Sequence, residues 1–442
     1  MSDKPRILLV GHGAREHVIA ESLKKSEIEL FSFMSSKNPG ITALSKKIQL
    51  GNLNDFKKLN DFVHGLNLDF AVIGPESPLG DGIADELAKL GVPCVGPKKE
   101  PAQLEISKAF CRDLMTKYKI SGNPEHIISA DIQEIKNFLN QYEEVAVKPD
   151  GLTGGKGVKV SGDHLMNTKE VLDYCQELIK SGSKVIIEEK LIGEEFTLQA
   201  FIDGTGSHLV GCPLVQDHKR LLNGDEGPNT GGMGSYSCSD HKLPFVDEKT
   251  IKSAINIMEK TVDCVKKETG EEYKGILYGQ FMLTRKGPKL VEYNVRFGDP
   301  EAMNVLPILK GDFVEICERI LDGKLNTLDI QFENKATVCK YLAPKGYPVD
   351  AKPTEVIVDE KAIQKEGARL YYASVHKENG KITTTKSRSI GVLGIADKIE
   401  KAEQIAEKSI KYIKGELYHR SDVGTIDLLN LRINHMKKVL GH

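Results

Sequence analysis

Three polar side chains could act together in the stretch 290–301, whose sequence is LVEYNVRFGDPE. Alternate side chains of a β-strand share one face, so Glu292, Asn294 and Arg296 would lie along one ridge. Carboxylate and amide oxygens suit Mg²⁺, and a guanidinium can bind a phosphate or carboxylate through two parallel hydrogen bonds. The stretch predicts a site where a metal, a phosphate and a small charged substrate meet. The alternative is a half-exposed edge strand with a salt bridge.

A glycine-rich turn at 11–17 (GHGAREH) lies between an apolar run and a helical pattern. Free amides at the start of a helix favour an anion, which Arg15 could also reach. Glu16 stands where the dinucleotide fingerprint G-x-G-x-x-G requires its third glycine. The turn therefore predicts a site for a single phosphate rather than for a cofactor pyrophosphate, with a plain turn as the alternative.

A second glycine-rich segment, 148–157 (KPDGLTGGKG), lacks the order of a Walker A motif. Its backbone amides could still surround phosphates, with Lys148 and Lys156 balancing their charge. A flexible hairpin is the alternative.

Two further segments end in polar residues. The run 185–195 (VIIEEKLIGEE) reads as a strand whose end could contact an adenine edge, with Glu195 near ribose hydroxyls. Taken alone, this run favours a solvated strand end. The run 216–234 (QDHKRLLNGDEGPNTGGMG) predicts a loop of nearly twenty residues, and loops of that length inside a compact domain are usually functional or disordered. Its polar side chains favour a substrate site. His218 in this loop is equally consistent with a catalytic role and with none.

The elements that must position these residues begin with an α/β pattern over residues 1 to about 100. Strand, helix and strand alternate at the spacing of a parallel sheet, with sites expected at the carboxyl ends of the strands. The expected strands are 6–10, 70–73 and 92–95, and the expected helices run to about residue 23 and over 80–90.

From about residue 101 the pattern becomes α+β, and beyond a polar linker at 325–333 it becomes β-rich. In the middle part, helices are expected at 102–118 and 132–141, and strands at 144–148, 157–161, 184–189, 195–202 and 208–214. In the last part, strands are expected at 336–342, 369–376, 381–384 and 390–396, and a helix at 398–415.

The bulk composition bounds the class of protein. A chain of 442 residues with 40% hydrophobic and 28% charged residues is long enough for two to four globular domains. A net charge of −2 provides no electrostatic reason to expect nucleic acid or an acidic membrane. The eight cysteines lack metal-site spacing, and neither a signal peptide nor an apolar run of membrane-spanning length is present. We therefore expect a cytoplasmic protein with reduced thiols.

Taken in order, the motifs resemble the phosphoribosylamine–glycine ligase family of the ATP-grasp superfamily. The matching runs are GHGAREH, VIGPESPL, QLEISKAF, VKPDGLTGGKGV, VIIEEKLIGEE, QDHKR with GPNTGGMG, and VEYNVRFGDPE. The last two are the most specific, because other ATP-grasp enzymes share the phosphate loop and the metal strand but not this pair. The resemblance implies an α/β and α+β multidomain fold: a Rossmann-like N-terminal domain (1–107), an ATP-grasp domain (108–325) and a small β-rich C-terminal domain (326–442).

The resemblance also implies an activity, in which ATP phosphorylates glycine and 5-phosphoribosylamine attacks the glycyl phosphate. The products are glycinamide ribonucleotide, ADP and phosphate, in purine biosynthesis. ATP is then a co-substrate, and Mg²⁺ or Mn²⁺ is expected on Glu292 and Asn294. The expected partners are small-molecule substrates, with neither nucleic acid nor membrane, and the expected state is a monomer or weak dimer. Other ATP-grasp ligases or carboxylases and a non-catalytic nucleotide-binding regulator remain as alternatives.

The resemblance assigns roles to three overlapping sets of residues. The catalytic set is Arg296, Asp299 and Lys156. The ATP-binding set is Lys108, Lys148, Gly154, Gly155, Lys156, Gly157, Glu188, Glu189, Leu191 and Glu195. The substrate-binding set is Gly11, Gly13, Arg15, Glu16, Asp217, His218, Lys219, Pro228, Asn229, Thr230, Arg296, Gly298 and Asp299. The chain departs from the wider superfamily at Gln280, where a second metal-binding acid is common.

Overall fold

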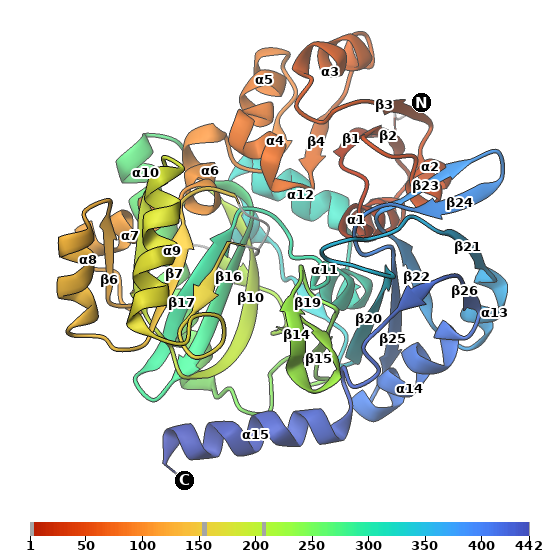
Figure 1. Ribbon diagram of the computed structural model, residues 1–442. Coiled ribbons are helices and arrows are strands. Elements are labelled where there is room, and N and C mark those ends of the chain that lie inside the picture. The colour runs from red at the N-terminus through yellow and green to blue at the C-terminus, as the bar shows by residue number, and fades with distance from the viewer. Residues whose placement is uncertain (1–3, 153–156, 206–208, 442) are drawn as a thin grey trace.

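The N-terminal region is a parallel five-stranded sheet with the order β3-β2-β1-β4-β5 (Figure 1). The computed structural model describes residues 4–152, 157–205 and 209–441. β1 and β4 are almost wholly apolar because helices cover both faces of the sheet. The expected helix over 80–90 is two helices, because Gly82 adopts a left-handed φ of 93° between them. The elements are β1 (Arg6–Val10), α1 (Ala14–Leu23), β2 (Glu29–Met34), α2 (Pro39–Leu44), β3 (Lys47–Leu50), α3 (Phe56–Val63), β4 (Phe70–Ile73), α4 (Glu76–Asp81), α5 (Ile83–Lys89) and β5 (Cys94–Val95).

The central region has two antiparallel four-stranded sheets, with the orders β6-β9-β7-β8 and β11-β10-β16-β17. The single helix expected at 102–118 is divided at Ser107, whose hydroxyl caps the second helix by accepting from the Phe110 amide at 3.0 Å. The elements are α6 (Lys99–Ile106), α7 (Lys108–Lys117), β6 (His126–Ser129), α8 (Ile132–Leu139), β7 (Val145–Pro149), β8 (Lys159–Val160), α9 (Thr168–Lys180), β9 (Val185–Glu189), β10 (Gly193–Asp203), β11 (Leu209–Gly211), α10 (Glu248–Thr269), β16 (Lys274–Thr284) and β17 (Gly287–Asn294).

A β-bulge shapes the strand that carries the predicted metal ligands. The register of β17 against β16 shifts by one residue, so that Val291 has no cross-strand partner. Leu290 is therefore fully buried in the core, while Glu292 lies opposite Gln280 and Asn294 follows on the same face. The predicted alternation holds from Glu292 onward and fails at Val291, which is half-buried at the bulge.

The C-terminal region is built on an antiparallel sheet that begins in the middle of the chain. Its order is β12-β15-β20-β25-β22, with β27 paired to β20. β12 and β15 precede the boundary expected at 325, so this sheet joins the two sides of that boundary. The expected loop 216–234 contains an antiparallel pair, β13 and β14. The elements are β12 (Gln216–Asp217), β13 (Arg220–Leu222), η1 (Asn223–Asp225), β14 (Glu226–Asn229), β15 (Gly234–Ser237), β20 (Ala336–Pro344), β21 (Glu355–Val358), α13 (Glu360–Lys365), β22 (Arg369–Tyr372), β23 (Val375–Glu378), β24 (Lys381–Thr384), β25 (Ile390–Ala396), α14 (Ile399–Ile410), β26 (Ile413–Lys414) and β27 (Leu417–Tyr418).

The expected polar linker 325–333 is packed rather than free. Leu325 is fully buried, and β19 (Gln331–Phe332) pairs with β18 (Leu309–Lys310). The remaining elements between the two regions are α11 (Ala302–Val305), η2 (Leu306–Ile308), α12 (Phe313–Asp322) and η3 (Leu325–Thr327). Two large hydrophobic clusters each contain side chains from all three regions, so the regions are packed against one another through shared cores.

A final helix, α15 (Ile426–Leu440), was not among the expected elements. It begins at the Thr425 cap and runs from the C-terminal sheet back to β10, along the lower edge of the molecule in Figure 1. In the ranges that the structure describes, no helix is long and apolar enough to cross a membrane.

Candidate active site

Two lysines from neighbouring elements lie at the start of the second glycine-rich segment. Lys148 is the penultimate residue of the buried strand β7, and its Nζ donates to the Val291 carbonyl at 3.2 Å. The bulge exposes this carbonyl to the site. Lys108 opens α7, and its Nζ donates to the Gly151 carbonyl at 2.7 Å. Burial lowers the pKa of Lys108, while Glu292 acts in the opposite direction. The pair anchors one end of the segment and places two cations beside β17.

Glu188 anchors this group from β9. Its carboxylate accepts from Arg112 Nε at 2.7 Å and Nη2 at 3.1 Å, and lies 2.8 Å from Lys148 Nζ. Burial alone would raise its pKa, but Arg112 and Lys148 outweigh burial and lower the pKa to about 2. Glu188 was expected near adenosine, which stays a prediction. In the structure its carboxylate is paired with Arg112 and holds Lys148 in place.

The other residues expected around ATP lie along β9 and β10. Glu189 accepts from the Glu125 amide at 3.1 Å, and Leu191 is half-buried in the connection between the strands. Glu195 contacts Gln280 and lies 3.4 Å from Lys219 Nζ. The Gly157 carbonyl accepts from the Tyr174 hydroxyl at 2.7 Å, whereas Gly154, Gly155 and Lys156 lie outside the described residues.

The predicted metal ligands lie among cations. Burial raises the pKa of Glu292, but four basic residues led by Lys219 lower it overall, so that the carboxylate is ionised. Asn294 Oδ1 accepts from Arg296 at 2.8 Å, and an amide oxygen has a second lone pair. Gln280 Oε1 is buried opposite Glu292 and has no hydrogen-bond partner among the described residues. Within those residues, no group of three or more His, Cys, Asp or Glu side chains could hold a metal.

Arg296 forms ion pairs with two carboxylates from the N-terminal side of the chain. Its Nη2 lies 2.7 Å from Glu105, and its Nε lies 3.1 Å from Glu76. Burial alone would raise the pKa of Glu76. The guanidinium groups of Arg296 and Arg15 outweigh burial and lower this pKa to about 2. The salt bridge considered as an alternative is thus present. It holds the guanidinium rigidly beside Asn294, which is compatible with a role in binding phosphate.

The first glycine-rich turn differs from the expected phosphate cradle, because a carboxylate occupies it. Glu16 accepts from the Gly13 amide and, at 2.6 Å, from Arg15 Nε. A Cβ at Gly11, where φ is 120°, would lie 2.5 Å from the Glu16 side chain, so glycine is required there. Arg15 also donates to the Phe297 carbonyl at 3.2 Å, which connects the first turn to the segment that follows β17.

Alternation along the 216–219 segment separates the predicted substrate residues into two groups. Asp217 and Lys219 face the site. Burial raises the pKa of Asp217, and the nearby carboxylates of Glu301 and Glu195 raise it as well. His218 points to the opposite side, against Tyr236, at a ring-centroid distance of 5.9 Å. Burial lowers its pKa to about 3. The structure therefore does not bring His218 together with the other substrate residues.

The remaining predicted substrate residues line the hairpin and the turn after β17. Pro228 is exposed, Asn229 is half-buried and Thr230 is buried, and the Thr230 hydroxyl donates to the Lys219 carbonyl at 2.7 Å. The Gly298 amide donates to Gln199 Oε1 at 2.8 Å.

Two residues of the C-terminal region complete the site and were missed by the sequence analysis. The Tyr341 hydroxyl donates to Asp299, and Arg388 lies 3.4 Å from the other oxygen of the same carboxylate. Arg388 also donates to the Gly232 carbonyl at 3.0 Å, and its Nε has no partner in the described part of the chain. A Cβ at Gly232 would lie 3.7 Å from Asp217, so the GPNTGG run brings these groups together. No local motif marks either residue, because Tyr341 lies in an ordinary strand pattern and Arg388 lies in the connection between β24 and β25.

Three family models match the chain in the order of its regions. They are the phosphoribosylglycinamide synthetase N domain at residues 5–105, its ATP-grasp (A) domain at 106–302 and its C domain at 337–426. Phosphoribosylamine–glycine ligases of Methanococcus maripaludis and Methanocaldococcus jannaschii are each 52% identical over 98% of this chain and 99% of their own length.

Solved structures agree with this match. The crystal structure of a phosphoribosylamine–glycine ligase from Thermotoga maritima has a TM-score of 0.80 at 28% identity, covering 94% of this chain and 99% of that chain. A biotin carboxylase domain from Hydrogenobacter thermophilus has a TM-score of 0.71 at 14% identity, over 99% of this chain and 94% of that one, which shows a shared fold alone. The predicted multidomain fold and the predicted resemblance are confirmed, and the chain belongs to the phosphoribosylamine–glycine ligase family of ATP-grasp enzymes.

Proposed function

We propose that the chain joins glycine to 5-phosphoribosylamine at the expense of ATP, through a glycyl phosphate, in the cytoplasm. The observation that carries the proposal is the meeting of Lys108, Lys148, Lys219 and Arg296 around the carboxylate of Glu292. Such a cluster of cations with an oxygen ligand at its centre suits the phosphates of ATP.

A magnesium or manganese ion fits the oxygen atoms of this strand. Glu292 contributes a carboxylate, Asn294 an amide oxygen and Gln280 a buried amide oxygen that lacks a partner among the described residues. Hard cations that retain water and phosphate oxygens need only a few protein ligands. Bound there, the ion would neutralise part of the phosphate charge.

Positioned cations support the transfer of the phosphoryl group. A carboxylate is a poor electrophile, because attack adds charge to an anion, and phosphorylation supplies a leaving group. We assign Arg296 to the transferring phosphoryl group, since Glu76 and Glu105 fix its guanidinium before substrate binds. Lys148 and Lys108 take the ATP phosphates, together with the 154–157 run expected from the sequence.

Asp217 is the better of the two candidates for the glycine ammonium. Asp217 is half-buried and Glu301 is buried, and the pKa values of both carboxylates are raised, mainly by desolvation, so a bound cation would favour their ionised forms. The charge of Asp299 is already matched by Arg388. Because a Cβ at Gly13 would lie 3.8 Å from Asp299, we place Asp299 beside the attacking amine, between the first turn and Arg388.

The phosphoribosylamine is proposed to lie between the first turn and the hairpin. Arg15 and Glu16 border one side, and Pro228 to Thr230 border the other, as the sequence analysis expected. Arg388 Nε, which lacks a partner among the described residues, is available to an anionic group of this substrate.

Phosphate release tests the proposal directly. Purified protein with Mg²⁺, ATP, glycine and freshly prepared phosphoribosylamine should release phosphate, and omission of either glycine or the ribosylamine should abolish release. Turnover without the ribosylamine, or a preference for another amino acid over glycine, would contradict the proposed substrates. Bicarbonate-dependent turnover would instead indicate a carboxylase, the class of the structural neighbour with the shared fold.

A further inference from the structure

The hairpin that leads to Pro228 is weakly held by apolar packing. Leu222 is 39% exposed, and the residues from 223 to 228 are exposed except for Asp225. Asp225 has a φ of 58°, a left-handed conformation that few residues other than glycine adopt. Leu221 packs against the small cluster of Met233, Ala343 and Tyr347, but the tip of the hairpin beyond it has little apolar burial to hold it in position.

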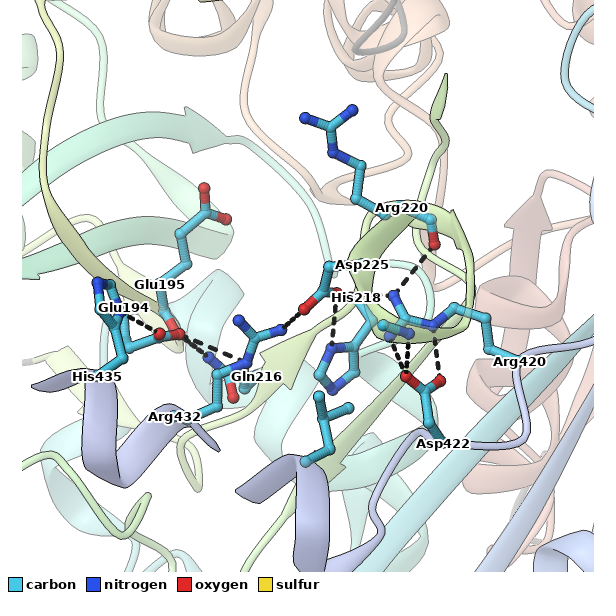
Figure 2. A network of polar contacts seen from close by, with 12 residues as sticks. Glu194, Glu195, Gln216, His218, Arg220, Asp225, Arg420, Asp422, Arg432 and His435 are labelled. Carbon is cyan, nitrogen blue, oxygen red and sulfur yellow. Dashed lines mark hydrogen bonds and ion pairs between the residues drawn. The ribbon is translucent and has the colours of Figure 1, made fainter. Parts of the chain in front are cut away.

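The hairpin tip is bound instead by a short segment that follows β27 (Figure 2). Arg420 is fully buried, donates to Asp225 at 2.8 Å and reaches the Arg220 carbonyl at 3.2 Å. The Asp422 carboxylate accepts from the Gly224 amide at 2.9 Å and from Arg420 Nη2 at 2.7 Å. Side chain, carbonyl and amide groups of the hairpin are thus all bound by residues about 200 positions later in the chain.

The last helix adds a second attachment. Arg432 of α15 donates to the other oxygen of Asp225, and its Nε lies 3.5 Å from Glu194 of β10. His435, one turn further along α15, contacts the other Glu194 oxygen at 2.6 Å. Figure 2 shows that Arg432 lies between Glu194 on one side and Asp225 on the other. The helix therefore ties the hairpin to β10.

His218 lies inside this network rather than in the active site. Its Nδ1 is 3.9 Å from Asp225, and its neutral ring fills the space between the hairpin and Tyr236. Because residues 217 and 219 point to the opposite face, a displacement of the hairpin at His218 would move Asp217 and Lys219 as well.

We propose that Arg420, Asp422 and Arg432, with their partner Asp225, form a C-terminal clamp. The clamp positions the 220–229 hairpin, and through it Pro228 to Thr230, for the phosphoribosylamine. These are positioning residues, since none of them faces Glu292 or Lys148. The identity of the substrate in this inference rests on the proposed function, whereas the attachment of the hairpin does not.

The kinetic test uses Arg432→Gln, because this side chain is partly exposed and its loss leaves the buried Arg420 in place. We expect the KM for phosphoribosylamine to rise about tenfold, with kcat and the KM for ATP changed less than about twofold. Lys437→Gln removes the same charge from an exposed position of the same helix and should leave all three constants unchanged. The clamp would be refuted if Arg432→Gln left the KM for phosphoribosylamine unchanged. It would also be refuted if the variant impaired kcat, the KM for ATP and the KM for phosphoribosylamine to the same extent.

A second measurement does not depend on substrate. Cleavage by glutamyl endopeptidase after the exposed Glu226 should be about tenfold faster in Arg432→Gln than in the wild type and in Lys437→Gln. The double variant Asp225→Asn with Arg432→Gln should show no more cleavage than the worse single variant, because Arg432 reaches the hairpin through Asp225 and both substitutions remove this ion pair. Equal cleavage rates in all variants would overturn the clamp. Absence of ribosylamine-dependent turnover in the wild type would overturn the proposed function alone.

Discussion

Replacement of Glu188 by glutamine removes the only carboxylate described here that contacts both Arg112 and Lys148. Its pKa is 4.5 in the unfolded chain and about 2 in the fold. At ~1.4 kcal/mol per pH unit, the ionised carboxylate contributes roughly 3 kcal/mol to the free energy of unfolding at pH 7. Breaking a buried ion pair costs about 3–5 kcal/mol, which agrees with that value.

The sign of the pH dependence follows from the lowered pKa. The contribution of Glu188 is fully present above pH 4.5 and is lost as the pH falls toward 2. The difference in unfolding free energy between wild type and Glu188→Gln, measured by urea titration, should therefore be largest near pH 7 and shrink in acid. The KM for ATP should rise about tenfold as Lys148 loses its ionic partner.

Glu189→Gln is the matched control. The neighbouring carboxylate lies 3.5 Å from Lys289 at a partly exposed position, so its loss should cost under about 1 kcal/mol. The role of Glu188 as the anchor of Lys148 would be refuted if Glu188→Gln lowered the free energy of unfolding by less than about 1 kcal/mol at pH 7. A difference in unfolding free energy between wild type and variant that grows as the pH falls would also refute it.

Three further substitutions test other parts of the site and the fold. Arg296→Lys keeps the charge but loses the planar guanidinium that bridges two carboxylates, so kcat should fall roughly 10²–10³-fold. The affinity for ATP, measured by equilibrium dialysis, should be nearly unchanged. A kcat within about tenfold of the wild-type value would contradict the assigned role of Arg296. Glu292→Gln should raise the Mg²⁺ concentration needed for half-maximal phosphate release at least about tenfold, and an unchanged metal titration would remove Glu292 from the metal site. Gly40→Ala places a Cβ 2.0 Å from the buried ring of His17, so thermal unfolding should show a loss of about 1–3 kcal/mol, and an unchanged transition would show that the ring can move freely.

The local sequence predicted the structure correctly where the feature depends on the residues of a single strand or turn. Alternation placed Glu292 and Asn294 on one face, and apolar runs located β1, β4 and β9 to within a residue. The motifs also identified the family, because its specific residues lie in short contiguous runs. Breaks at single residues were harder to predict: Gly82 and Ser107 each divide a helix whose apolar periodicity continues across the break.

Tertiary structure decided which charges meet. Glu188 reads as a strand-end acid, yet Arg112, 76 positions earlier, makes it an anchor for Lys148. Tyr341 and Arg388 enter the site only because β20 pairs with β15 of the 216–237 segment and β25, which follows Arg388, pairs with β20. The C-terminal clamp joins groups about 200 residues apart, and no periodicity within either segment encodes that contact. Side-chain type and spacing determine which chemistry is available, but the free energy of a buried ion pair depends on a partner and a dielectric environment that only the folded chain supplies.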